Sequence, residues 1–187
     1  MIQLLTDEGA VSWCRARGLV AGGLLPSKRL AFAMEPALGF RTPLGESAIS
    51  LMSLDYVLLM SLVPDDDEQR FPGGILWLQE WDIWSETTER VGQLIARRLR
   101  GEQGFAWSLQ DRPAQVFGVG QITEARAAFA IPLLFQWDAH FVPATGTHCC
   151  FSSHDGYLDV YARDSEVLDR LVTRFEVGGL ATLSLPP

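Results

Sequence analysis

The dipeptide Asp155-Gly156 between two short extended segments is the feature that most restricts what this chain can fold into. Asp-Gly in this position is a strong signal for a β-hairpin, here formed by residues 147–152 and 157–161. A further strand is expected over residues 139–142. Asp164 then offers a helix start, and the helix is expected to run to about residue 175. The last third of the chain is therefore predicted to contain a hairpin followed by a helix.

Helices and strands alternate in the chain before this hairpin. Thr6, followed by two acidic residues, predicts a helix over residues 7–17, and Ser85 predicts one that ends near Arg100. Further helices are expected over residues 47–63 and 122–137, the latter with a kink or break at Pro132, which lacks an amide donor. Strands are expected over residues 28–34, 73–81 and 115–119, and residues 39–45, which contain Gly and Pro, are expected to form a loop.

This order of elements predicts an α+β fold, described as a mixed α/β sandwich. We expect a mixed sheet of about five or six strands, with helices packed on it and the hairpin and helix at its C-terminal end. The chain has 187 residues, of which 48% are hydrophobic and 20% charged. That length supports a single globular domain over residues 1–187, and that composition excludes an intrinsically disordered chain.

The charge balance argues against nucleic acid as a direct ligand. The chain carries 15 basic and 23 acidic residues, a net charge of −8, and it has no basic run. No membrane association is expected, because the longest apolar stretch, residues 48–63, contains Asp55 and is too short to span a bilayer. The start of the chain lacks a secretory signal, and three cysteines are an odd number. A cytoplasmic location with free, mostly buried thiols is therefore expected, and no cofactor is predicted.

Two segments carry a resemblance when they are taken together. Trp77-Leu-Gln-Glu-Trp-Asp-Ile-Trp84 has the pattern W-x-x-E-W-x-x-W, and Phe151-Ser-Ser-His-Asp155 follows it later in the chain. The pair resembles a group of small bacterial proteins with no known activity, over roughly residues 76–159. This resemblance implies a bacterial single-domain protein, and it implies no catalytic residues.

All three histidines lie within fifteen residues of one another, beside two cysteines and two aspartates. If residues 147–154 are extended, His148, Cys150, Ser152 and His154 share one face, and Asp138 and His140 share a face of a neighbouring strand. The residue types suit zinc, although no known zinc-ligand spacing is present. The alternatives are a metal site formed by four residues, Asp138, His140, His148 and His154, or ordinary polar residues near a turn.

A cysteine hydrolase can be assembled from the same segment. Cys150 or Cys149 would be the nucleophile, His154 or His140 the base, and Asp138 or Asp155 the group that orients the imidazole ring. The position of the thiols in the middle of a strand argues against this, because reactive thiols usually lie at a helix N-terminus or next to a positive charge. Small buried hydrophobic residues describe the cysteines better.

A second candidate site follows the predicted strand over residues 73–81. Trp81 and Trp84 alternate there with Glu80 and Asp82. If these aromatic rings are exposed, the segment would bind arginine or lysine side chains of a partner by cation–π contact and charge pairing. Aromatic rings buried under the next helix are the structural alternative.

Two functional hypotheses result. The first is a non-enzymatic, acidic, cytosolic binding protein that neutralises a basic partner, for example an immunity protein for a secreted toxin. The second is a hydrolase or metal-dependent enzyme that uses Asp138, His140, His148, Cys150 and His154. A cleft lined by all three histidines would favour the enzyme, whereas scattered histidines would exclude it. The first hypothesis is preferred because it requires nothing special of these residues, and the sequence makes no prediction of the oligomeric state.

Overall fold

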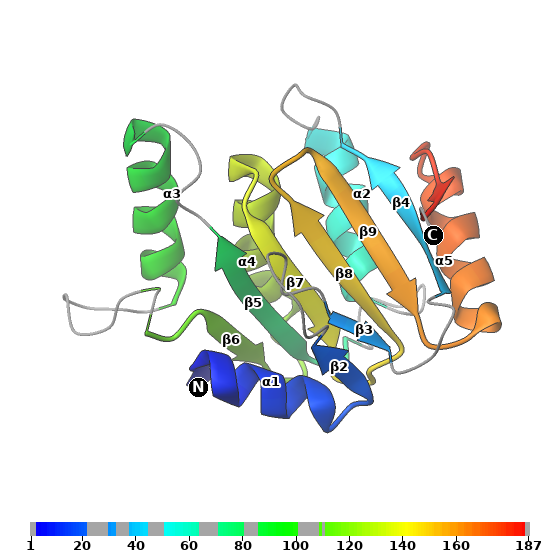
Figure 1. Cartoon of the computed structure of the whole chain (residues 1–187). Coiled ribbons are helices and arrows are strands. Elements are labelled where there is room, and N and C mark those ends of the chain that lie inside the picture. Colours follow the sequence, from blue (N-terminus) through cyan, green and yellow to red (C-terminus); the bar gives the residue numbers. More distant parts are fainter. Residues whose placement is uncertain are drawn as a thin grey trace.

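The structure is a computed structural model that describes residues 3–21, 30–32, 38–44, 51–63, 71–80, 86–100, 109 and 111–185 (Figure 1). Five helices are present in these ranges: α1 (Asp7–Arg15), α2 (Leu51–Leu62), α3 (Glu86–Leu99), α4 (Ile122–Phe135) and α5 (Ser165–Val177). The longest of them have 14 residues. Within the described ranges, every helix is too short or too polar to span a bilayer.

Ten strands accompany these helices in the same described ranges. They are β1 (Gln3–Leu5), β2 (Leu19–Ala21), β3 (Leu30–Phe32), β4 (Leu38–Pro43), β5 (Gly74–Glu80), β6 (Ala114–Phe117), β7 (Asp138–Pro143), β8 (His148–Ser153), β9 (Tyr157–Ala162) and β10 (Leu183–Ser184). Eight of them form one sheet in the order β1-β6-β5-β7-β8-β9-β4-β10, and β2 pairs with β3 separately.

The expected α+β class is confirmed, as is the C-terminal hairpin, β8–β9, followed by helix α5. The sheet differs from the expectation in two ways. All of its pairings are antiparallel, so it is not mixed. It also has eight strands instead of five or six. β1 and β10 are only three and two residues long and give little sequence signal, and β4 lies where a loop is expected, whereas the strand expected over residues 28–34 belongs to the separate β2–β3 pair.

Both faces of the sheet are covered, as Figure 1 shows. Helices α2, α3, α4 and α5 lie on one face, which we call the helix face, and α1 with the β2–β3 pair lies on the other, which we call the α1 face. Successive residues of a strand point to opposite faces. Leu76, Phe141 and Val160 therefore join the core on the helix face, while Trp77 and Val142 join the core on the α1 face.

Strand β4 contradicts the expectation of a loop over residues 39–45. Gly and Pro are unfavourable in strands, but β4 lies between β9 and β10 and pairs with β9 along its whole length. A Cβ atom on Gly39 would lie 2.5 Å from the carbonyl oxygen of Val160, so glycine is what allows the two backbones to approach here. Pro43 ends the strand. Pairing partners distant in sequence thus override the local preference.

The helix ends follow local sequence signals closely. The Thr6 side chain accepts a hydrogen bond from the Gly9 amide and caps α1, as expected, although α1 ends at Arg15 rather than at residue 17. Helix α4 continues through Pro132, so of the two alternatives expected there, a kink or a break, the break does not occur. The helix ends at Gln136, which has a left-handed backbone (φ 53°). The backbone amides of Gln136 and Trp137 both donate hydrogen bonds to the carbonyl of Pro132.

Candidate functional site

Asp138 and His154 meet at the end of the sheet where β7 begins and β8 has just ended. His154 donates two hydrogen bonds to Oδ1 of Asp138, one from Nδ1 and one from its backbone amide, both at 2.8 Å. Asp138 is 7% exposed, and the side chain of His154 is about one-third exposed. On its other side, Nε2 of His154 lies 3.5 Å from Oδ1 of Asp155. The imidazole ring is thus held between two carboxylates.

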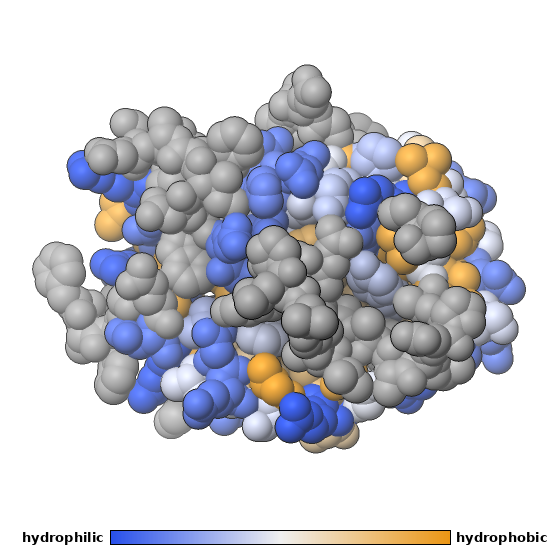
Figure 2. All heavy atoms as spheres, viewed as in Figure 1, coloured by the Kyte–Doolittle hydropathy of each residue, from blue (hydrophilic) through white to orange (hydrophobic). Residues whose placement is uncertain are grey.

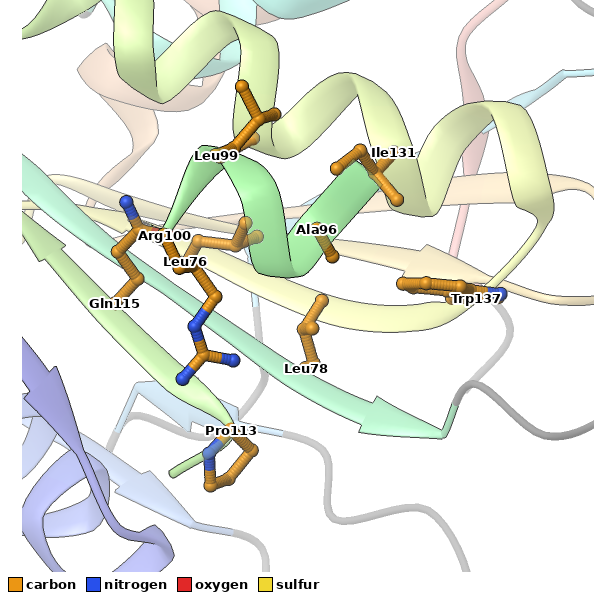
Figure 3. Close-up of a pocket in the computed structure, with 10 residues that line it drawn as sticks. Leu76, Leu78, Ala96, Leu99, Arg100, Pro113, Gln115, Ile131 and Trp137 are labelled. Atoms are coloured by element: carbon orange, nitrogen blue, oxygen red, sulfur yellow. The ribbon is translucent and has the colours of Figure 1, made fainter. Parts of the chain in front are cut away.

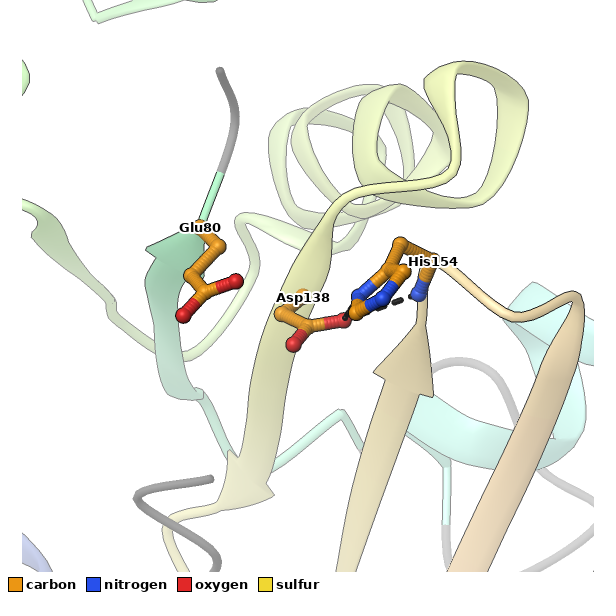
Figure 4. Close-up of side chains that lie close together, drawn as sticks. All are labelled: Glu80, Asp138 and His154. Atoms are coloured by element: carbon orange, nitrogen blue, oxygen red, sulfur yellow. Dashed lines mark hydrogen bonds and ion pairs between the residues drawn. The ribbon is translucent and has the colours of Figure 1, made fainter. Parts of the chain in front are cut away.

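A β-bulge brings Glu80 to the same place. Leu76 and Leu78 point to the helix face, and strict alternation along β5 would turn Glu80 to that face as well. The register between β5 and β7 shifts between Leu78 and Glu80, and beyond this shift Glu80 lies opposite Asp138. Directly opposed residues of antiparallel strands share a face, so the bulge turns Glu80 toward Asp138. We call Glu80, Asp138 and His154 the strand-end cluster (Figure 4).

The electrostatics of the strand-end cluster favour positive charge. Burial acts to lower the pKa of His154, but its hydrogen bond to Asp138 and the negative charges of Asp138, Asp155 and Glu80 outweigh this effect. The pKa of His154 therefore lies above its ordinary value, and the imidazolium form is stabilised. Hydrophilic side chains gather over this end of the sheet in Figure 2.

His140 belongs to the α1 face but lies in an apolar setting. It is fully buried, and its ring lies 4.8 Å from that of Phe151 and 6.1 Å from that of Trp77, measured between ring centroids. Its Nδ1 is 3.8 Å from the sulfur of Cys149. The imidazole is therefore packed among aromatic rings inside the core.

His148 points to the opposite face of the sheet. Its Nε2 lies 2.7 Å from the backbone oxygen of Ser61, and its Nδ1 lies 3.2 Å from the hydroxyl oxygen of Thr147. Burial lowers its pKa to about 4, so the ring is neutral near pH 7 and donates from Nε2 to Ser61. This arrangement connects β8 to α2.

The three histidines consequently do not form one site. Of the four residues suggested as metal ligands, the structure brings Asp138 and His154 together and leaves His140 and His148 on opposite faces of the sheet. Cys150 shares the helix face with His148, as the strand periodicity predicts. The last member of that expected face, His154, lies beyond the end of β8 and reaches Asp138 instead.

The cysteines lack the surroundings of a nucleophile. All three thiols are free and buried, as expected. Burial raises the pKa of Cys150 to about 12 and that of Cys149 well above its ordinary value, so both stay protonated near neutral pH. Cys150 faces the helices, whereas His154 and Asp138 lie at the strand ends. The structure therefore does not assemble the triad of Cys150, His154 and Asp138.

The aromatic-acidic segment is described only in part. Glu80, its first acidic residue, is exposed at the end of β5. Trp81, Asp82 and Trp84 lie outside the described residues. Sequence reasoning assigned Glu80 to this segment and missed its proximity to Asp138, because the bulge that creates it depends on pairing with a strand about sixty residues away.

A separate pocket lies on the helix face between α3, α4, β5 and β6, near the residues labelled in Figure 3. Its lining is mainly apolar and includes Leu76, Leu78 and Ile131, with Arg100 as the charged member. The guanidinium group of Arg100 donates a hydrogen bond to the carbonyl of Arg112. The sheet separates this pocket from the strand-end cluster, and it contains no acid–base pair.

Comparisons with family models, curated proteins and solved structures yield no match for this chain.

Proposed function

We propose that this chain is a non-enzymatic binding protein whose acidic end of the sheet binds positively charged groups of a basic protein partner. The observation that carries the proposal is the convergence of three carboxylates, Glu80, Asp138 and Asp155, around the single imidazole of His154. Asp155 and Glu80 are exposed, so both carboxylates are accessible to a partner. The net charge of −8 supports attraction of a basic partner over longer distances.

The segment that follows Glu80 extends this proposal. Trp81, Asp82 and Trp84 are its next candidates, because an arginine or lysine side chain that pairs with Glu80 could also contact an aromatic ring. In its most specific form, the proposal is a cytoplasmic, bacterial immunity-type protein that neutralises a basic secreted toxin. The small size and the acidity of the chain support this form.

The enzyme hypothesis receives less support from the geometry. It requires either converging histidines or an activated thiol, and His140, His148 and His154 lie in three separate environments. Both candidate nucleophiles, Cys149 and Cys150, have raised pKa values because they are buried. We therefore do not propose hydrolysis.

A peptide-binding experiment tests the proposal directly. A fluorescently labelled oligo-arginine peptide is titrated with the protein at low and moderate salt, and its anisotropy is measured. We expect binding that weakens with salt, and a several-fold weaker binding for the double variant Glu80→Gln/Asp155→Asn. Both residues are exposed, so neither substitution creates a buried unpaired group.

The matched control removes two negative charges elsewhere. Glu166 and Asp169 are exposed on α5, which covers the other face of the sheet. If Glu166→Gln/Asp169→Asn weakens binding as much as the site variant does, the peptide responds to net charge alone and the site is not supported. The same site variant is then used in a pull-down from lysate, in which loss of one stoichiometric basic protein identifies the partner.

A further inference from the structure

We propose that the strand-end cluster is a binding site for a borderline divalent metal ion of the zinc class. Glu80, Asp138 and His154 each offer one ligand atom, and these three atoms all lie within 4.8 Å of one another. The ligands are two carboxylates and one imidazole, and they come from the end of β5, the start of β7 and the turn after β8. The proposal goes beyond partner binding, since it requires no protein partner.

The separation of the ligand atoms is close to what the ion needs. With metal–ligand bonds of about 2.1 Å, two ligands of a tetrahedral zinc ion lie about 3.4 Å apart. Since 4.8 Å is the upper limit of the separations, the most distant pair of ligand atoms must approach by at most about 1.4 Å. Glu80 is exposed at the end of its strand, so a change in its side-chain rotamer can provide this movement.

Asp138 has the properties of a preformed ligand. It is 7% exposed, and both hydrogen bonds from His154 fall on Oδ1, so Oδ2 carries neither of them. A carboxylate this deeply buried is costly unless its charge is compensated. In the structure the two hydrogen bonds from His154 stabilise Oδ1, and a divalent cation on Oδ2 would compensate the negative charge directly.

The β-bulge gives an independent reason to assign a role to Glu80. Without the register shift between Leu78 and Glu80, this carboxylate would point to the helix face and away from Asp138. Bulges disrupt the ladder, and they often occur where a side chain must be re-aimed at a functional site. Here the group that the bulge turns is the carboxylate of Glu80, which is the third ligand of the strand-end cluster.

The donor types identify the class of ion. Imidazole nitrogen with carboxylate oxygen suits zinc and its neighbours, whereas magnesium and calcium prefer oxygen ligands alone. Three protein ligands leave a fourth tetrahedral position for water. We therefore expect Zn²⁺ to bind more tightly than Mg²⁺ or Ca²⁺.

The test is calorimetric titration of the full chain, stripped of metal with a chelator, with ZnCl₂ and then with MgCl₂ and CaCl₂. We expect one zinc per chain, with affinity reduced at least about tenfold by Glu80→Gln and by His154→Asn. Glu166→Gln is the matched control, because it removes an exposed carboxylate on α5, away from the cluster. Absence of zinc binding, or equal losses for Glu80→Gln and Glu166→Gln, would overturn the proposal.

Cobalt substitution separates this site from the buried thiols. A Co²⁺ complex of the cluster has no sulfur ligand, so its absorption spectrum should lack a thiolate charge-transfer band. A strong band would place the ion at a cysteine and contradict the assignment. The titration contains no peptide, so failure of the metal site leaves the partner-binding experiment unaffected, and failure of peptide binding leaves the metal site unaffected.

Discussion

The imidazole of His148 donates a hydrogen bond to the backbone oxygen of Ser61, with 2.7 Å between Nε2 and the oxygen. Ser61 lies in the last turn of α2, where carbonyl groups lack partners within the helix. Arg174 of α5 donates in the same way to the carbonyl of Val63, at 2.7 Å. The end of α2 is thus bonded to side chains from β8 and α5.

His148 makes the stability of the protein depend on pH. Its pKa is about 4 in the folded chain and near 6.5 when unfolded, so the unfolded state binds the proton more readily between these values. Its contribution to stability is complete above pH 6.5 and is lost as pH falls toward 4. The loss amounts to about 3 kcal/mol. Urea unfolding at about pH 7 and about pH 4.5 measures it.

The variant His148→Gln isolates this effect from other titrating groups. Its amide can still donate to Ser61, but it does not titrate. His154, whose pKa is raised, contributes with the opposite sign, and it is present in both proteins. An unchanged difference in stability between the two pH values in His148→Gln would show that another group is responsible.

A second prediction concerns Arg41 and Asp159, which face each other on β4 and β9. Nε and Nη2 of Arg41 donate to the two carboxylate oxygens at 2.6 and 2.8 Å, and the guanidinium lies 3.6 Å from the ring centre of Tyr157. Asp159 is fully buried. We expect Arg41→Ala to destabilise the fold by about 3–5 kcal/mol, because the carboxylate is left buried without its partner. Urea unfolding checks this.

The double variant Arg41→Leu/Asp159→Leu distinguishes the loss of the Arg41–Asp159 attraction from the cost of a buried carboxylate that has lost its partner. Replacing both partners by apolar residues removes the buried charge together with its counter-ion, so much of the stability should return. Arg98→Ala, at an exposed position on α3, is the control for loss of an arginine. A double variant that is less stable than Arg41→Ala would refute the explanation.

A third prediction concerns the close approach of α3 to the start of β7. A Cβ atom on Gly92 would lie 2.6 Å from Cζ2 of Trp137 and 3.1 Å from Cγ of Phe135. Trp137 is fully buried and has little room to move. Gly92→Ala should therefore destabilise the protein by about 1–3 kcal/mol. In an exposed helix position the same change would stabilise by about 1 kcal/mol. The sign of the shift in the urea midpoint decides between these outcomes.

A fourth prediction concerns the reactivity of the thiols. Cys14, Cys149 and Cys150 are buried, and burial raises the pKa of each of them. A thiol-reactive disulfide reagent should modify none of them in the native protein and all three in denaturant. Rapid modification of one thiol under native conditions would mean that the fold opens locally at that strand or helix.

The elements that the sequence predicted well are those whose signals are local. Asp164 predicts the start of a helix, and its side chain accepts a hydrogen bond from the amide of Val167 at the start of α5. The turn at Asp155-Gly156 was expected from the same kind of signal, and Gly156 has φ 77°. In both cases the residues that decide the conformation lie within a few positions of one another.

The elements that were missed depend on distant partners. Gly39 and Pro43 suggest a loop when they are considered alone, and only the backbone of β9 makes them part of a strand. The same holds at the strand-end cluster. The sequence identified Asp138 and His154 as candidates, but the turn of Glu80 toward them requires a register shift against β7. Such a shift has no signature within β5 itself.

The position of β4 in the sheet has a consequence for synthesis of the chain. Arg41 is paired with Asp159, which is 118 positions later in the sequence. At typical rates of elongation, translating that interval takes roughly 6 to 24 s, far longer than a hairpin needs to form. During this time β4 has no neighbouring strand on either side, because β10 is translated later than β9, so its backbone groups are hydrogen-bonded to water. The sheet can be completed only when the last third of the protein has emerged from the ribosome.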